Sequence, residues 1–154
     1  IRFLLEKGAD IHEGKKRSVT PLHEAAREGC LVAAAFLLEN GAEVDARDGD
    51  GQTPLHSVVW SGTLRRIHNV VQLLIDKGAD IEAVDAKGMT PLQKAIAFGY
   101  SEQVIDCLVE NGANVEVTDR DGRNLLQLGR KHHQYRFARR FARRSARIKN
   151  HASR

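Results

Sequence analysis

Apolar residues recur along the chain every three or four positions in short segments, and polar stretches rich in Gly and Asp separate these segments. This spacing places the apolar side chains on one face of a helix. The pattern predicts four helices that begin near Leu22, Leu55, Leu92 and Leu125. It predicts that the first three are each followed by a second helix, over residues 31–40, 69–77 and 102–111.

We expect apolar residues from both helices of each pair to form one core. The expected core residues are Leu22, Ala25, Leu37, Leu55, Leu73, Leu74, Leu92, Ala95, Val104, Leu108 and Leu125.

The chain repeats itself. The string Leu-Leu-Glu-Lys-Gly-Ala-Asp-Ile at residues 4–11 returns in similar form at 37–44, 73–81 and 108–115. The glycines of these strings are residues 8, 41, 78 and 112, so the steps between them are 33, 37 and 34 residues. A second signature starts twelve residues after each glycine, at 20, 53, 90 and 124. It contains all three prolines of the chain at one position, so the chain is built from an internal repeat.

The second signature has the composition of a helix start. It reads Thr-Pro-Leu-His twice, then Thr-Pro-Leu-Gln and Asn-Leu-Leu-Gln. Thr is a favourable N-cap, and Pro at the next position fixes φ where the missing N–H costs no hydrogen bond. The side chain three positions after the cap can hydrogen-bond back to the cap, as in a capping box. Those side chains are His23, His56, Gln93 and Gln127. Because Gln replaces His there, we interpret both histidines as structural hydrogen-bonding groups, not as proton-transfer groups.

One such unit cannot bury its own apolar face, whereas stacked units can. The Thr-Pro-Leu-His-x-Ala pattern, with a step of 33 residues, resembles the ankyrin repeat over nearly the whole chain. The resemblance implies an all-α repeat solenoid of stacked helix-turn-helix units with short β-hairpin-like projections. It also implies a non-catalytic scaffold that binds a partner protein and needs no cofactor, metal or small-molecule substrate.

The register divides the chain into five units. They are a second-helix remnant of a truncated repeat (1–14), a repeat (15–47), a repeat with a four-residue insertion (48–84), a repeat (85–118) and a degenerate C-terminal capping repeat with a basic helix (119–154). The insertion is interpreted as a tolerated surface loop, with a functional loop as the alternative. Because the chain opens on Ile1 within a helical pattern, we expect it to be a piece of a longer protein.

The resemblance also implies where a partner binds. In the family, the exposed end of the first helix and the tip of the projection line a concave groove. The register places these residues there: Arg27, Glu28, Trp60, Ser61, Lys87, Met89, Phe98, Arg120 and Arg123. Trp60 and Phe98 hold equivalent positions in neighbouring units, and exposed aromatic residues are frequent binding anchors. The alternative is that the insertion after Trp60 covers its ring and buries it.

The net charge of +4 is unevenly distributed. Residues 1–129 hold 14 Lys and Arg and all 20 Asp and Glu, a balance of −6, whereas residues 130–154 hold 10 Lys and Arg and no acid. A helical plot of 134–149 places Phe137, Phe141 and Ile148 on one stripe. The opposite side holds Arg136, Arg139, Arg140, Arg143, Arg144 and Arg147.

We therefore predict a basic amphipathic helix at residues 134–149 that caps the stack with its Phe stripe. A cap does not require six arginines. The alternative function is therefore binding of an anionic partner through these arginines: nucleic acid, an acidic membrane surface or a nuclear transport receptor.

No catalytic, cofactor or metal motif is present: the sequence lacks a phosphate-binding Gly-rich loop, His-Glu-x-x-His and Gly-x-Ser-x-Gly. The aspartates of the polar connections lack the EF-hand spacing, so we interpret them as turn formers. No apolar run approaches the ~20 residues of a membrane span, so we predict no transmembrane segment. The two cysteines lack metal-site spacing and suit a reducing compartment, which predicts an intracellular protein, cytoplasmic or nuclear.

Overall fold

The structure, a computed structural model, describes residues 19–60, 67–98 and 102–131. Its helices are α2 (Pro21–Arg27), α3 (Leu31–Glu39), α4 (Pro54–Ser57), the 3₁₀ turn η2 (Val58–Trp60), α5 (Ile67–Asp76), α6 (Pro91–Phe98), α7 (Glu102–Glu110) and α8 (Leu125–Lys131). The seven helices predicted between residues 22 and 131 are confirmed, whereas the predicted basic helix at 134–149 lies outside the described residues. Three of the four first helices begin at the Pro, one residue before the predicted Leu, and the second helices match the predicted ranges to within two residues.

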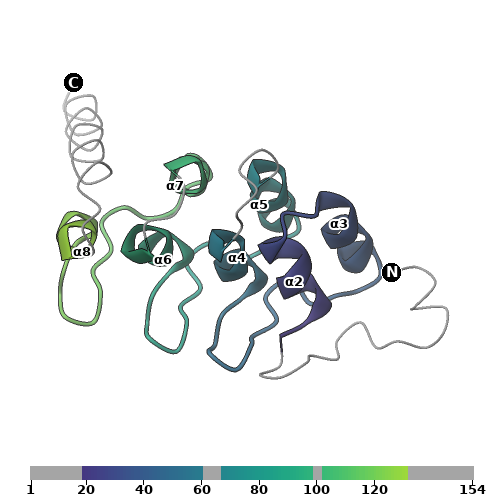
Figure 1. The fold of residues 1–154 in the computed structure, drawn as a ribbon, viewed down its shortest axis with the longest axis horizontal. Coiled ribbons are helices and arrows are strands. Elements are labelled where there is room, and N and C mark those ends of the chain that lie inside the picture. The colour runs from purple at the N-terminus through teal and green to yellow at the C-terminus, as the bar shows by residue number, and fades with distance from the viewer. Residues whose placement is uncertain (1–18, 61–66, 99–101, 132–154) are drawn as a thin grey trace.

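The helices form two rows (Figure 1). The inner row consists of α2, α4, α6 and α8, and the outer row consists of α3, α5 and α7. Neighbouring helices contact one another both along each row and between the rows. Long loops project from the inner row on the side away from the outer row. This arrangement confirms the predicted all-α repeat fold.

The predicted β-hairpin-like projections are not confirmed. Within the described ranges the loops contain no β-strand, and an isolated antiparallel bridge joins Thr118 to Asn124. The loops are held by the turn hydrogen bonds of their aspartates instead. In three of the loops the N–H of the first Asp also donates to the carbonyl four residues later, over 2.9–3.0 Å.

The predicted capping boxes are present at all four inner helices. The Thr20 N–H donates to His23 Nδ1 over 3.2 Å, and the Thr53 N–H donates to His56 Nδ1 over 3.1 Å. In the other two helices the side-chain Oε1 of Gln accepts the same bond, at 2.9 Å in the third and 3.0 Å in the fourth. Because each histidine accepts at Nδ1, its ring proton lies on Nε2.

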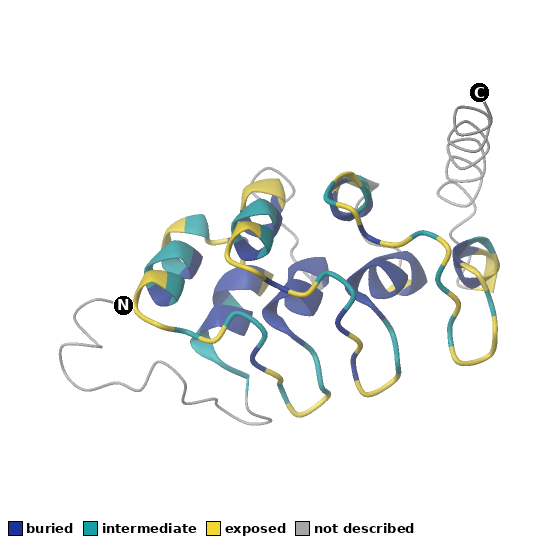
Figure 2. Cartoon of the chain, turned by 180° about the vertical axis from the view of Figure 1, so that it is seen from behind, coloured by how far each residue is buried: buried dark blue, intermediate teal, exposed yellow. Residues whose placement is uncertain are grey.

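The core lies between the two rows of helices (Figure 2). Every predicted core residue is buried except Leu73, which is only partly buried. The prediction for Leu73 was wrong because the buried side of α5 is formed by Ile67, Val70, Val71 and Leu74, which recur every three or four residues. Leu74 occupies the inward direction in α5, which leaves its neighbour on the flank of the helix.

The outer helix α3 differs from its two neighbours. It is apolar on all sides, yet only Ala34 and Leu37 are buried, and Val32 is 80% exposed. No helix of the described residues is both long and apolar enough to span a membrane.

Candidate partner-binding surface

Three loops of the described residues share one turn. In each, Oδ1 of the first Asp accepts hydrogen bonds from the N–H groups two and four residues later. Asp48 accepts over 2.9 and 2.8 Å, Asp85 over 2.9 and 3.0 Å, and Asp119 over 2.9 Å twice. The interpretation of these aspartates as turn formers is confirmed.

Adjacent loops are joined to one another. The Ala86 N–H donates to the Asp50 carbonyl over 2.9 Å, which links the tips of the first two loops. This approach requires glycine at position 51, since a Cβ there would lie 2.9 Å from the Ala86 nitrogen. Arg120 Nη2 donates to the Ala86 carbonyl over 2.9 Å and joins the second loop to the third. The loop tips therefore form one connected row.

Two histidines connect successive repeats. His23 Nε2 donates to the Gln52 carbonyl over 2.9 Å, and His56 Nε2 donates to the Met89 carbonyl over 3.0 Å. Burial lowers the pKa of His56 to about 4, against the partial opposition of the Met89 hydrogen bond. The ring is therefore neutral near pH 7, which agrees with a structural role. Sequence analysis predicted the capping bond and missed this second one.

The step from the third repeat to the fourth lacks such a bond. Gln93 is 1% exposed, its Oε1 accepts from the Thr90 N–H, and its Nε2 has no hydrogen-bond partner among the described residues. By register, the carbonyl equivalent to those of Gln52 and Met89 belongs to Arg123. All three carbonyls accept the N–H of the Asp four residues earlier, over 2.9–3.0 Å. The acceptor is thus in place, but Gln93 Nε2 does not use it.

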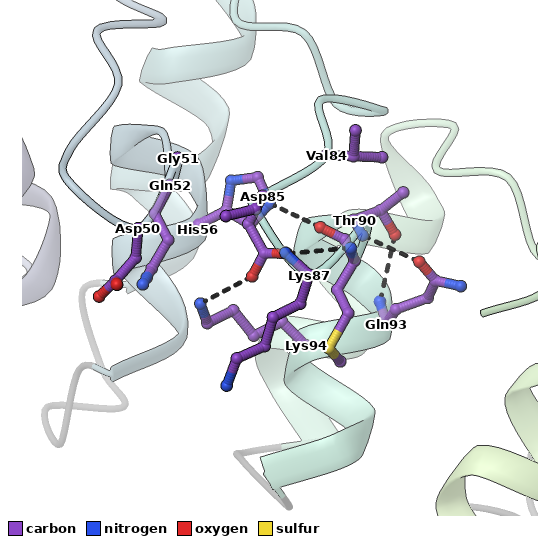
Figure 3. Close-up of polar contacts among 12 residues, drawn as sticks. Asp50, Gly51, Gln52, His56, Val84, Asp85, Lys87, Thr90, Gln93 and Lys94 are labelled. Atoms are coloured by element: carbon purple, nitrogen blue, oxygen red, sulfur yellow. Dashed lines mark hydrogen bonds and ion pairs between the residues drawn. The ribbon is translucent and has the colours of Figure 1, made fainter. Parts of the chain in front are cut away.

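A buried ion pair connects α6 to its own loop (Figure 3). Lys94 Nζ lies 3.3 Å from Asp85 Oδ2, and both side chains are buried. Burial lowers the pKa of Lys94, and the attraction of Asp85 offsets this only in part. Burial alone would raise the pKa of Asp85, but the Met89 N–H and the Lys94 charge hold it below its ordinary value. Sequence analysis missed this pair, for which the only signal was a charged residue between two core positions.

The predicted site residues on the loops fall into two groups. Lys87 and Arg120 are exposed at the tips. Met89 is partly buried and packs against the core. Arg123 is held by acids of its own loop: its Nε donates to Asp119 Oδ2 over 2.8 Å, and its Nη2 also pairs with Asp121. Its guanidinium is therefore less available to a partner than that of Arg120.

The predicted site residues at the helix ends also differ. Phe98 ends α6 and is 45% exposed. Arg27 and Glu28 are exposed at the end of α2, where Arg27 pairs with Glu24 and lies 3.8 Å from Glu28. Trp60 ends η2, but its side chain and the whole of Ser61 lie outside the described residues. The exposure of Trp60 thus stays a prediction.

The six arginines predicted to bind an anionic partner also lie outside the described residues: Arg136, Arg139, Arg140, Arg143, Arg144 and Arg147. Their helix and its binding role stay predictions.

The described residues hold no group of three or more side chains that could bind a metal ion. Both cysteines are free: Cys30 is exposed and Cys107 is buried. Burial, with a smaller effect from Glu110, raises the pKa of Cys107 to about 11. Its thiol is therefore protonated near pH 7.

A family model described as ankyrin repeats (3 copies) matches residues 1–85 and residues 65–150 of the chain. The two matches overlap and together reach from the first residue almost to the last. No curated protein matches the chain.

Proposed function

The chain belongs to the ankyrin repeat family, whose members generally act in protein–protein interactions, and we propose that it is a non-catalytic scaffold that binds a partner protein through its loop tips and inner-helix ends. One observation carries the proposal: Phe98 is 45% exposed at the end of α6, an inner helix whose own loop belongs to the connected row of tips. An exposed aromatic ring on a rigid frame suits binding, because little side-chain or loop entropy is lost on association.

The proposed surface comprises the register-predicted residues: Arg27, Glu28, Trp60, Ser61, Lys87, Met89, Phe98, Arg120 and Arg123. We expect unequal contributions. Aromatic and arginine side chains at the centre of an interface usually dominate its energy. Arg123 already pairs with two acids and should contribute less than Arg120.

The test compares the full chain with a Phe98→Ala variant and a Val32→Ala variant as affinity baits in cell lysate. Val32 is an exposed apolar residue on the outer row, so it controls for general loss of apolar surface. Proteins retained by the unchanged chain and by Val32→Ala should be lost from Phe98→Ala. Each captured protein, once purified, should bind the unchanged chain and Val32→Ala more tightly than it binds Phe98→Ala. Capture that is identical for all three baits would contradict the proposal.

The sequence favours a second candidate, because six arginines and no acid lie between residues 136 and 147. We propose that this segment binds an anionic partner. Replacing Arg139, Arg140, Arg143 and Arg144 with Gln should abolish a salt-sensitive association with a 20-base-pair DNA duplex or with phosphatidylserine vesicles. If the unchanged chain binds neither probe at low salt, this candidate is wrong.

A further inference from the structure

One face of α6 is turned toward the loops. Lys94 and Phe98 lie four residues apart on this helix, so they share a face. Lys94 Nζ reaches Asp85 Oδ2 at 3.3 Å, which brings this face against the loop that begins at Asp85. Lys87 is exposed at the tip of the same loop. Phe98 is thus exposed one helical turn beyond a fixed contact between helix and loop.

The loop acids beside Phe98 are already engaged. Asp85 uses Oδ1 for its turn and Oδ2 for Lys94. In the next loop, both Asp119 and Asp121 pair with Arg123. Each of these acids is thus paired with a base of the protein, although Asp119 and Asp121 share the one charge of Arg123.

The bases on the same side are not neutralised. Lys87 at the second loop tip and Lys131 at the end of α8 are exposed, and neither forms an ion pair within the described ranges. Arg120 is exposed as well, and its bond to the Ala86 carbonyl leaves its charge uncompensated. Toward α2 the exposed charges are mixed: Asp50 is an acid, and Glu28 lies 3.8 Å from the base Arg27. The C-terminal half of the surface is therefore the basic half.

We propose that Phe98, Lys87, Arg120 and Lys131 form a recognition surface for an acidic peptide segment of a partner protein that carries an apolar side chain. The apolar side chain packs on Phe98, and the carboxylates on either side of it pair with the bases. This inference rests on the proposed scaffold function and specifies the chemistry of its partner. A nucleic acid fits less well, because its backbone carries a charge at every nucleotide and a long run of it would also meet the exposed acid Asp50 at the neighbouring loop tip.

The experiment measures fluorescence anisotropy of three labelled peptides with the full chain at low salt. Each peptide has a central Leu flanked on both sides by four Glu, four Gln or four Lys. The Glu peptide should bind most tightly, and its Kd should rise with ionic strength. The variant Lys87→Gln/Lys131→Gln should weaken it about threefold or more, and Phe98→Ala about tenfold.

Two controls isolate the surface. Lys77 is an exposed lysine in the outer row, directly after α5, so Lys77→Gln removes a matched charge and should change the Kd little. A variant in which Gln replaces Arg139, Arg140, Arg143 and Arg144 tests whether the Glu peptide binds the C-terminal arginines instead. Circular dichroism melts verify that each variant is folded.

The inference is overturned if the Glu peptide fails to bind, if the Lys peptide binds better, or if affinity depends on the C-terminal arginines and not on Lys87 and Phe98. It is also overturned if a dT₂₀ oligonucleotide occupies the surface more tightly than the Glu peptide does. If the Glu peptide does not bind but lysate capture still depends on Phe98, the acidic partner is refuted and the scaffold function stands. If neither peptide binding nor lysate capture depends on Phe98, both the acidic partner and the proposed scaffold surface are refuted.

Discussion

Replacing Gln93 by His should strengthen the junction between the third and fourth repeats. His23 and His56 each use Nδ1 for the capping bond and Nε2 for a carbonyl of the next repeat, at 2.9 and 3.0 Å. Gln93 makes only the capping bond, and its buried Nε2 is unpartnered within the described ranges. In Gln93→His, Nε2 should reach the Arg123 carbonyl.

The structure sets the size of the effect. A buried polar group without a partner costs about 1–3 kcal/mol, and a new hydrogen bond contributes about 0.5–1.5 kcal/mol. The imidazole is bulkier than the amide, and overpacking a core costs about 1 kcal/mol or more. We expect the free energy of unfolding to rise by about 1 kcal/mol, which raises Tm by about 3 °C for a chain of this size.

Urea denaturation followed by circular dichroism measures this change, provided that the m-value stays constant. Hydrogen exchange should also slow in the loop that precedes α8, because the new bond ties Arg123 to α6. Gln127→His is the matched control, since Gln127 holds the same register position but is exposed and faces no following loop within the described residues. If Gln93→His gives no more stability than Gln127→His, the account of the inter-repeat bond is wrong.

Three further predictions concern buried ionisable groups. Lys94→Met leaves Asp85 buried without its counter-charge, so urea denaturation should show that the free energy of unfolding falls by about 3 kcal/mol. A second change, Asp85→Asn, should restore part of this free energy. If it restores none, the ion-pair argument is contradicted. The folded state keeps the pKa of His56 at about 4, whereas the unfolded state takes up the proton below about 6.5, so the free energy of unfolding should fall by up to about 3 kcal/mol as pH drops between these values. The free energy of unfolding should fall less in His56→Gln. An equal fall in this variant would show that His56 does not cause the pH dependence. Because burial raises the pKa of Cys107 to about 11, a thiol reagent at pH 8 should modify only Cys30 in the folded chain and both cysteines in urea.

The helix starts could be predicted because the determinants are local. Thr and Pro fix the first turn of an inner helix, and the side chain three positions later completes the capping box, whichever of His or Gln it is. All but one of the core positions that the periodicity predicted are buried, but the core also holds residues that it did not name, such as Val58, Val70 and Ile96. The periodicity failed at Leu73, which lies beside the buried stripe of Ile67, Val70, Val71 and Leu74 and is only partly buried against the core.

The contacts between repeats could not be predicted in the same way. His56 donates to the carbonyl of Met89, and every residue carries a carbonyl, so no side chain in the sequence marks the acceptor. The burial of Lys94 has a related cause. Its counter-charge, Asp85, lies nine residues earlier on a loop, and only the folding of that loop against α6 brings the two groups together.

The turn chemistry also determines which loop residues remain available for recognition. The first Asp of each described loop supplies an acceptor oxygen to two N–H groups, and the fourth residue is a glycine with φ of 71°, 73° or 72°. A side chain at that φ is strained, so the fold constrains both positions. The second and third positions carry neither constraint, and they hold Gly49 and Asp50, Ala86 and Lys87, and Arg120 and Asp121. Partner specificity on this frame should therefore depend on two positions per loop, where charge can change without altering the turn.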